Sequence, residues 1–291
     1  MTEIPRPVLR WHGGKWRLAP WIIAHMPTHH IYVEPFGGAA SVLLRKQRLR
    51  AECYNDLDQG VVNVFRVVRD PATAADLHRR LALTPFAREE FDWTYEPAVD
   101  DVDAAHKAIV RSFFGFGSDS VTRSCRTGFR ARLSDNKAFA ANAWRKYADT
   151  IPMFCDRLQG VLIENRPAQE IMERFDAPGV MHYVDPPYVV ATRSSLVGRS
   201  GATHGYRHEL TDDDHGDLLE FLIGLQGYVL LSGYPSPIYD AALPGWRRIE
   251  MSALADGARP RIEVLWINPA AAAALDERAG GYGTPLFATA L

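Results

Sequence analysis

The stretch Ile31–Leu49, "IYVEPFGGAASVLLRKQRL", joins an apolar run, a glycine turn and a helical spacing of apolar residues. The run "IYVEP" predicts a strand, and Val42, Leu43 and Leu44 predict the helix that follows it. Glycines at such a turn let the backbone approach a ligand, and the start of a helix favours a negatively charged group. A strand, a glycine turn and a helix in this order open a nucleotide-binding α/β sheet.

The same alternation continues along the rest of the chain. Before the first strand, a loop leads into an expected helix that contains Leu18, Ile22 and Ile23. Further strands are expected at 51–57, 160–165, 180–185, 228–233, 247–251 and 261–268, with helices at 60–70, 168–175 and 212–225. This pattern predicts a largely parallel sheet that closes with an antiparallel pair of strands.

Residues 71–157 differ in character, because they show helical periodicity and few β-branched runs. We interpret them as an inserted, mainly helical domain. The sheet domain is then discontinuous, formed by residues 1–70 and 158–270, and residues 271–291 form a C-terminal tail to which we assign no role.

Composition excludes several classes of protein. With 291 residues, 47% of them hydrophobic, the chain can bury a large core. Cys53, Cys125 and Cys155 are few, odd in number and far apart, which fits neither a disulfide framework nor paired zinc ligands, and we expect no metal site. The N-terminus lacks the apolar segment of a signal peptide, and no apolar run approaches the roughly 20 residues that span a bilayer. We therefore expect a soluble, cytoplasmic protein that does not associate with membranes.

The first candidate site is the loop "RWHGGKW", Arg10–Trp16. It lacks the spacing and the hydroxyl residue of an ATP-binding phosphate loop. The remaining functional interpretation is a loop whose backbone, at Gly14, and Lys15 meet a carboxylate, while Trp11 offers a stacking face. A plain surface turn is the alternative.

The second candidate is the glycine turn Glu34–Ser41, and the third is Asp56 at the end of the next strand. In nucleoside-binding sheets an acidic residue at the position of Asp56 meets ribose hydroxyls. The alternative for Asp56 is a helix N-cap, which is common at such a junction.

The fourth candidate is Asp185-Pro186-Pro187-Tyr188, which ends an apolar run. A turn is the simple explanation, because proline has no N–H for a strand ladder. Chemically, a carboxylate oxygen and a backbone carbonyl fixed by two prolines supply two acceptors for the N–H groups of an exocyclic amine. That arrangement would localise the nitrogen lone pair for attack on a methyl sulfonium, with Tyr188 stacked on the base. A base in a duplex would have to be flipped out to reach it.

The segments "RWHGGK", "YVEPFGGAAS", "NDLD" and "DPPY", in this order and with a long insertion before the last, resemble those of the Dam-type adenine-specific DNA methyltransferases, the phage and prophage members in particular. The similarity runs from about Val8 to Pro269. It implies a Rossmann-like S-adenosylmethionine methyltransferase sheet and S-adenosylmethionine as cofactor. It also implies that the cofactor site contains Trp11, Gly14, Lys15, Glu34, Phe36, Gly37, Gly38, Asp56, Asn165 and Asp185, and that the target amine is held by Asp185, Pro186, Pro187 and Tyr188.

The chain departs from the pattern of this family at two positions. The last glycine of the family's F-x-G-x-G turn is Ala40 here, which questions the closest backbone approach at that point. After the third strand, where many members place an aspartate near the adenine of the cofactor, this chain has "ENRPAQ", and Asn165 is the nearest polar substitute.

A basic patch in the insertion predicts a DNA-facing loop, in which arginines contact phosphates and guanine edges. The candidate DNA-binding residues are Arg111, Arg123, Arg126, Arg130 and Arg132. A solvated surface without function is the alternative. A second segment, Ala191–Leu210, has the length and the small polar residues of a flap over the flipped base, and Tyr206 and His208 are its candidate contacts.

We therefore predict a monomeric enzyme that transfers a methyl group from S-adenosylmethionine to the N6 amino group of adenine in double-stranded DNA, in the cytoplasm of a bacterial or phage-infected cell. Within the same class, amino methylation of cytosine in DNA or of an RNA base stays open, because each presents an exocyclic amine. A catalytically inactive DNA-binding relative is a further alternative. A dehydrogenase is disfavoured because the first turn lacks G-x-G-x-x-G.

Overall fold

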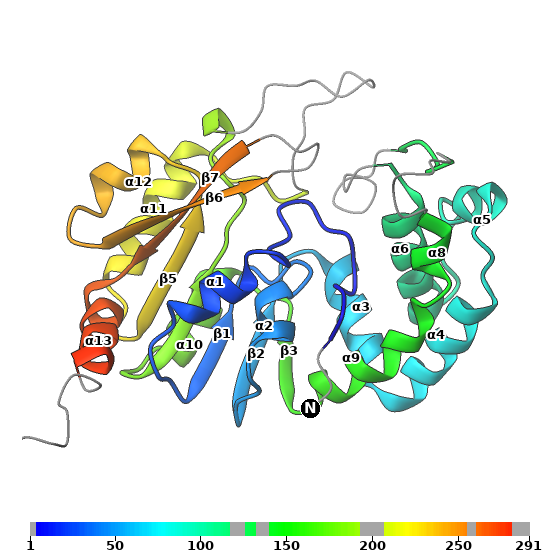
Figure 1. Cartoon of the computed structure of the whole chain (residues 1–291), viewed down its shortest axis with the longest axis horizontal. Helices are drawn as coiled ribbons and strands as arrows, with labels where there is room; N and C mark the ends of the chain where they lie inside the picture. The colour runs from blue at the N-terminus through cyan, green and yellow to red at the C-terminus, as the bar shows by residue number, and fades with distance from the viewer. Residues whose placement is uncertain (1–3, 117–125, 132–139, 193–206, 255–259, 281–291) are drawn as a thin grey trace, which may run out of the picture.

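A central sheet with the strand order β3-β2-β1-β4-β5-β7-β6 organises the computed structural model, which describes residues 4–116, 126–131, 140–192, 207–254 and 260–280 (Figure 1). The strands are β1 Ile31–Glu34, β2 Ala51–Asn55, β3 Val161–Glu164, β4 Val180–Val184, β5 Tyr228–Gly233, β6 Arg247–Leu254 and β7 Pro260–Ile267. Strands β1 to β5 pair in parallel, whereas β7 runs antiparallel to both β5 and β6. The predicted α/β class, with a mostly parallel sheet and a terminal antiparallel hairpin, is confirmed.

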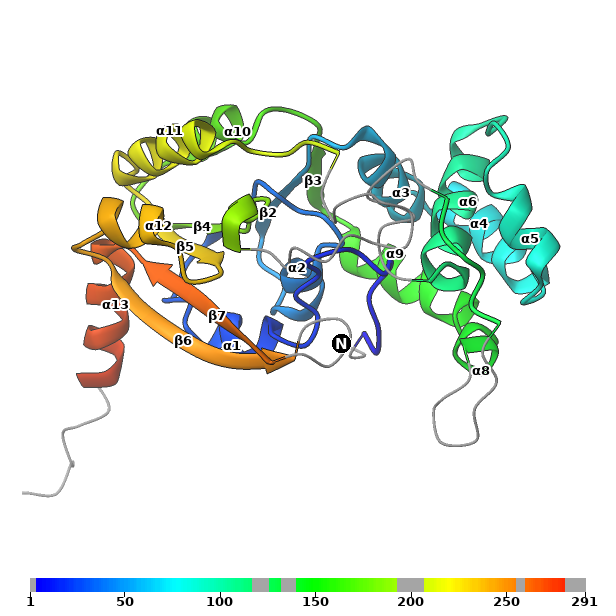
Figure 2. The same ribbon diagram turned by 90° about the horizontal axis from the view of Figure 1, so that it is seen from above.

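Helices cover both faces of this sheet, as Figure 2 shows. One face packs against α10 (Ala168–Phe175), α11 (Asp212–Ile223) and α12 (Pro237–Ala242), and the other against α1 (Ala19–Ala24), α2 (Ser41–Arg45) and α13 (Pro269–Gly280). Alternate side chains of β5 enter the two cores: Val229 and Leu231 pack on the first face, and Leu230 packs on the second. Burial on both faces explains why these strands are continuous apolar runs in the sequence.

The strand order reverses between β1 and β4, which lie side by side at the centre of the sheet. The chain leaves β1 toward β2 on one side and returns to β4 on the other. The carboxyl ends of β1, β2 and β4, at Glu34, Asn55 and Val184, lie at the same edge because these strands are parallel. Crevices at such reversal points hold the ligands of open α/β sheets.

A helical lobe stands beside the β3 edge of the sheet (Figure 1). It contains α3 (Gln59–Arg69), α4 (Pro71–Leu83), α5 (Arg88–Trp93), α6 (Asp101–Phe114), α8 (Ala140–Trp144), a short 3-10 helix (Ala148–Thr150) and α9 (Ile151–Leu158). Its core is aromatic: Phe114 contacts Phe86 and Trp144, and Trp144 stacks on Tyr147. Helix α3, which precedes the predicted boundary at residue 71, packs along α6, so the apolar core continues from the lobe into the sheet.

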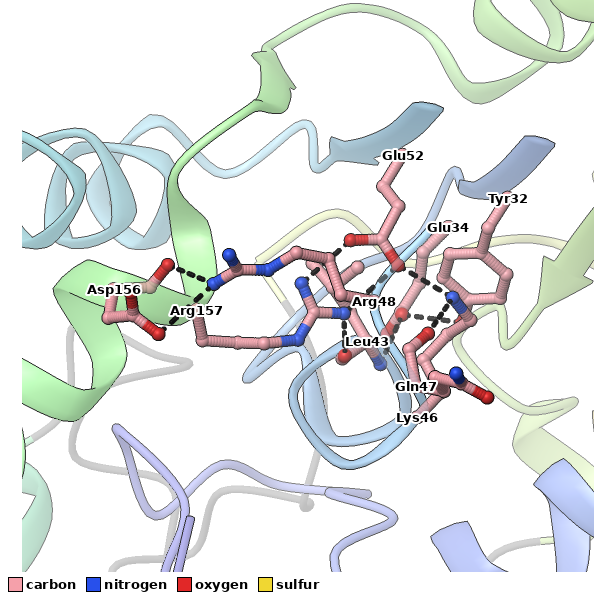
Figure 3. Close-up of polar contacts among 9 residues, drawn as sticks. All are labelled: Tyr32, Glu34, Leu43, Lys46, Gln47, Arg48, Glu52, Asp156 and Arg157. Carbon is pink, nitrogen blue, oxygen red and sulfur yellow. Dashed lines mark hydrogen bonds and ion pairs between the residues drawn. The ribbon is translucent and has the colours of Figure 1, made fainter. Parts of the chain in front are cut away.

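A buried ionic network joins the lobe to the sheet (Figure 3). Arg157, in α9, lies 2.7 Å from Oε2 of Glu52 on β2, and Lys46 lies 2.6 Å from Oε1 of the same carboxylate. Arg157 also donates a hydrogen bond to the carbonyl of Leu43, and the Lys46 ammonium lies 4.5 Å from the ring centre of Tyr32. The three charged side chains are at most 6% exposed. A pair of cations on one buried carboxylate therefore fixes the position of α9 against β2.

The C-terminal segment differs from the prediction. Residues from 271 onward, assigned to a tail, begin inside helix α13, whose Ala271 is fully buried against the sheet. The alanine run of this segment has high helix propensity, and its apolar face is covered by β5 and β7.

Candidate active site

The loops at the carboxyl edge of β1, β2 and β4 surround one pocket. The volume of this pocket, including its solvent-open part, is ≈ 850 Å³, which is in the range of small-molecule sites. The residues that line it are Trp11, His12, Gly13, Gly14, Lys15, Glu34, Phe36, Gly37, Gly38, Ala39, Ser41, Val42, Asp56, Leu57, Asp58, Tyr183, Asp185, Pro187, Arg207, His208 and Leu210. All four candidate sites from the sequence contribute to this lining.

The first loop brings a buried cation to the pocket. Lys15 is 4% exposed, donates a hydrogen bond to the carbonyl of Gly13 at 2.6 Å, and lies 2.9 Å from Oδ2 of Asp185. The carboxylate that Lys15 contacts in this structure is therefore the side chain of Asp185. Trp11 also lines the pocket, as the sequence analysis expected of its ring.

The glycine turn after β1 is packed between two aromatic rings. A Cβ atom on Gly37 would lie 2.1 Å from the ring of Tyr54, and one on Gly38 would lie 2.7 Å from Nε1 of Trp11. Gly38 also has a positive φ of 46°, and its carbonyl accepts the hydroxyl of Tyr54 at 2.8 Å. Both glycines are required because the aromatic rings leave no room for a side chain.

Ala40 occupies the place of the family's last glycine and keeps the backbone conformation expected there. Its φ of 51° and ψ of 36° lie in the left-handed region, immediately before α2. Ala40 is fully buried, so its methyl group packs in the core and does not face the ligand. The departure from the family pattern therefore leaves the path of the turn intact.

Asp56, which directly follows β2, supports the glycine turn by hydrogen bonds. Its Oδ2 accepts the backbone N–H of Gly38 and its Oδ1 that of Asp58, both at 2.8 Å. The alternative of a helix cap is wrong for Asp56, because Asp58 caps α3 by accepting the N–H of Gly60. Burial raises the pKa of Asp56 to about 6, and the two backbone hydrogen bonds oppose that rise.

Glu34 ends β1 as a buried acid facing the pocket. Its Oε2 accepts the hydroxyl of Tyr32 at 2.7 Å and the N–H of Leu43 at 2.9 Å. Burial raises the pKa of Glu34 to about 8, these two hydrogen bonds oppose the rise, and the charge of Asp185 adds to it. In the free protein this carboxyl is therefore largely protonated at neutral pH.

The Asp-Pro-Pro-Tyr turn follows β4, as the apolar run predicted. Both oxygens of Asp185 have partners: Oδ1 accepts the hydroxyl of Ser232 at 2.7 Å and Oδ2 pairs with Lys15. Asp185 and Pro187 line the pocket, whereas Pro186 is buried behind them. The carboxylate is thus held in one orientation at the mouth of the pocket.

Tyr188 lies next to the pocket and does not line it. Its side chain is 6% exposed, and its hydroxyl donates to Oε2 of Glu263 at 2.9 Å. The Lys15 ammonium lies 4.7 Å from its ring centre, and Tyr234 meets it edge-on at 4.6 Å.

Asn165 does not reach the pocket lining. Its amide donates hydrogen bonds to the carbonyls of Asp56 at 2.8 Å and Leu57 at 3.1 Å, and so supports the loop from behind. Ser41 and Arg207, which also line the pocket, fall within the predicted glycine turn and flap. Residues outside the predicted sites are Asp58 and Tyr183 in the lining, and Ser232 and Glu263 behind it. Ser232 and Glu263 do leave a signal, because each is a polar residue beside a run of apolar residues in its strand.

The predicted flap lies partly outside the described residues, which exclude 193–206 and with them Tyr206. Residues Arg207, His208 and Leu210 are described, and all three line the pocket. Arg207 lies 3.0 Å from Oδ1 of Asp58, so this segment is tied to the N-terminus of α3.

Two of the predicted DNA-binding arginines lie against the same aromatic ring. The guanidinium carbons of Arg111 and Arg126 lie 4.9 and 5.1 Å from the ring centre of Tyr95. Arg111 is half-buried and donates to the carbonyl of Thr94, whereas Arg126 is exposed and pairs with Asp92 at 2.6 Å. Arg130 is half-buried in the same lobe; Arg123 and Arg132 lie outside the described residues.

The donor set of the pocket indicates the chemistry of its ligand. Four carboxyl groups, those of Glu34, Asp56, Asp58 and Asp185, line one small space together with apolar and aromatic side chains. Lys15 and Arg207 line the same space and pair with Asp185 and Asp58, so the set suits a ligand with hydroxyl groups and a flat ring. No helix in the described ranges is long and apolar enough to cross a membrane.

Comparison with known proteins agrees with this geometry. A model of the D12 class N6 adenine-specific DNA methyltransferase family matches residues 11–227. The DNA adenine methylases of Salmonella typhi and Salmonella typhimurium are each 25% identical over 246 residues, which cover 80% of this chain and 82% of theirs. The DNA adenine methylase of Serratia marcescens is 33% identical over 104 residues, which cover 32% of this chain and 37% of that protein. Because the family model spans most of the sequence, the chain belongs to the D12 class N6 adenine-specific DNA methyltransferases, which methylate adenine in DNA.

Proposed function

We propose that this methyltransferase is a Dam-type enzyme that takes its methyl group from S-adenosylmethionine and acts on an adenine flipped out of double-stranded DNA. The observation that carries the proposal is the position of Asp185, whose carboxylate is held by Lys15 and Ser232 in the lining of the pocket. The family membership supports adenine as the base, so amino methylation of cytosine or of RNA is not favoured.

The chemistry of the pocket fits S-adenosylmethionine. The aromatic and apolar residues Trp11, Phe36 and Leu57 can enclose its adenine ring and methionine chain, and the backbone of the glycine turn lies beside them. Asp56, which lines the pocket, would accept hydrogen bonds from the ribose hydroxyls. When bound, the cofactor supplies an electrophilic methyl group on a sulfonium, and that positive charge favours the ionised form of Glu34.

The turn after β4 is suited to hold the target amine. One oxygen of Asp185 and the backbone carbonyl of Pro186 would each accept one N–H of the amino group. Two such hydrogen bonds draw the nitrogen out of conjugation with the ring, so that its lone pair is directed at the methyl group. After transfer the nitrogen carries a positive charge and must release one proton, and the Asp185 carboxylate is the acceptor that already contacts it. Pro187 lines the pocket next to this point.

The helical lobe is proposed as the part that recognises DNA. Arg126, exposed beside Tyr95, is a candidate phosphate contact, while half-buried Arg111 packs on the same ring. On this proposal residues 71–157 act as the target-recognition insertion and residues 1–70 with 158–270 as the catalytic domain. We keep the expectation of a monomer.

A single experiment tests the assignment of Asp185. Purified enzyme is incubated with labelled S-adenosylmethionine and DNA that lacks adenine methylation, and the labelled nucleosides are separated. We expect N6-methyladenine from the wild type and a loss of at least about 100-fold for Asp185→Ala. Asp276→Ala, a change on the exposed surface of α13, serves as the matched control and should leave the rate unchanged.

The outcomes distinguish the alternatives that the sequence left open. Label in cytosine would refute the choice of base. A wild type that binds DNA and transfers no label would identify an inactive DNA-binding relative. Full activity of Asp185→Ala would show that the target amine is held elsewhere.

A further inference from the structure

A buried acid lies behind the Asp-Pro-Pro-Tyr turn, on strand β7. Glu263, in β7, is 8% exposed, and its neighbour Val264 is fully buried. A carboxylate this deeply buried requires a compensating partner. Its Oε2 accepts the hydroxyl of Tyr188 at 2.9 Å.

The environment of Glu263 includes the charged groups of the active site. Burial raises its pKa, the Lys15 cation lowers it, and the negative charge of Asp185 raises it again. Lys15 also pairs with Asp185 and lies over the ring of Tyr188. The buried cation Lys15 therefore acts on both Asp185 and Glu263.

The ring of Tyr188 is restrained at three points. Lys15 lies at its face, Tyr234 contacts it edge-on, and Glu263 accepts a hydrogen bond from its far end. Lys15 and Tyr234 contact the ring itself and so restrain its plane. The hydrogen bond to Glu263 is directional and holds the hydroxyl end of the side chain in place.

We propose that Glu263 is a positioning residue that sets the orientation of Tyr188 for the flipped base. This inference rests on the proposed function and on the expectation from the sequence that Tyr188 stacks on the target base. The strand that carries Glu263 lies beyond residue 227, where the match to the family model ends. Asp185 is held in a similar way by Ser232 of β5, so the neighbouring strands β5 and β7 support both ends of the Asp-Pro-Pro-Tyr turn.

The proposal is tested by a double-mutant cycle on Tyr188→Phe and Glu263→Leu, with methyl transfer measured at saturating DNA and S-adenosylmethionine. If Glu263 acts through the tyrosine hydroxyl, each single variant loses kcat by roughly 10- to 100-fold. The double variant then loses no more than Tyr188→Phe alone. Glu263→Gln, which keeps an acceptor oxygen, should stay within about threefold of the wild type. The dissociation constant for S-adenosylmethionine, measured by calorimetry, should change little in all four.

Controls separate positioning from folding. Glu250→Leu, on the exposed surface of the neighbouring strand β6, should match the wild type in rate and in melting temperature. If Glu263→Leu alone does not fold, the kcat of the double variant is still compared with that of Tyr188→Phe. The double variant removes both polar partners together and leaves neither unpaired.

Two results would overturn the inference: a wild-type kcat in Glu263→Leu, or a double variant that is much slower than Tyr188→Phe. Failure of the proposed function has a different signature, since the wild type itself would then transfer no methyl group to DNA.

Discussion

Glu34 gives the protein a specific dependence of stability on pH. Its pKa rises from 4.5 to about 8 because burial disfavours the charged carboxylate. Between these two values the folded state binds a proton that the unfolded state has released. The contribution of Glu34 to stability is therefore fully present below pH 4.5 and is lost progressively as the pH rises to about 8. At about 1.36 kcal/mol for each pKa unit, the loss between pH 5 and pH 8 is roughly 3 kcal/mol.

Replacing Glu34 by glutamine should remove this loss. The amide oxygen can accept the same two hydrogen bonds, from Tyr32 and Leu43, and carries no charge at any pH. Between pH 5 and pH 8 the free energy of unfolding should therefore decrease by roughly 3 kcal/mol less in Glu34→Gln than in the wild type. Urea denaturation of the cofactor-free protein at four pH values measures this difference. Glu170→Gln, on the exposed side of α10, is the control and should follow the wild type.

The comparison isolates Glu34 because other groups with raised pKa values, such as Asp56, titrate in both proteins. Parallel stability profiles for the wild type and Glu34→Gln would refute the reasoning, since they would mean that Glu34 is ionised in the folded protein across this range. Saturation with S-adenosylmethionine should reduce the difference between the two profiles, because a bound cation favours the charged carboxylate.

Three further predictions follow from single contacts. Gly37→Ala places a Cβ atom in the ring of Tyr54, so it should destabilise the protein by about 1–3 kcal/mol, and an unchanged melting temperature would contradict this packing. Arg157→Met removes one cation from buried Glu52 and should cost about 3–5 kcal/mol in denaturant unfolding, whereas a cost below about 1 kcal/mol would show that the network does not hold the lobe. Asp56→Asn should weaken binding of S-adenosylmethionine about tenfold or more by calorimetry. Binding to the wild type should also weaken below about pH 6, where the Asp56 carboxylate takes up a proton. Binding that does not change with pH would exclude this role of Asp56.

The sequence predicted the sheet and the centre of the site because both depend on local signals. Apolar runs of strand length located β1, β2, β4 and β5, and the parallel alternation placed their carboxyl ends at one edge. Glycines at a strand-to-helix turn and an acid at the end of the next strand identified Gly37, Gly38 and Asp56. The match between these signals and the pocket reflects a general property of α/β folds, whose ligands bind where the strands end.

Other features could not be predicted, because they depend on contacts between segments far apart in the chain. Asp56 and Asp58 are two residues apart and equally plausible as helix caps, and only the backbone path assigns the cap to Asp58. The periodicity of the apolar residues does not indicate that β7 lies between β5 and β6. The partners of Ser232 and Glu263 could therefore not be predicted from the sequence. Asn165 lies at the end of the correct strand, but its amide turns toward backbone carbonyls behind the pocket.

The Asp-Pro-Pro-Tyr turn is therefore only part of the proposed catalytic unit. Its aspartate is held from one side by Lys15 of the N-terminal loop and from the other by Ser232, and its tyrosine is tied to β7 through Glu263. A fragment that ends at residue 227, the limit of the family match, would keep every residue of the turn and lose two of these three supports. The prolines restrict the backbone of the turn, but they do not fix the directions of its side chains. Those directions come from β5 and β7, which pack beside it, so the geometry proposed for methyl transfer depends on these two strands as much as on the motif.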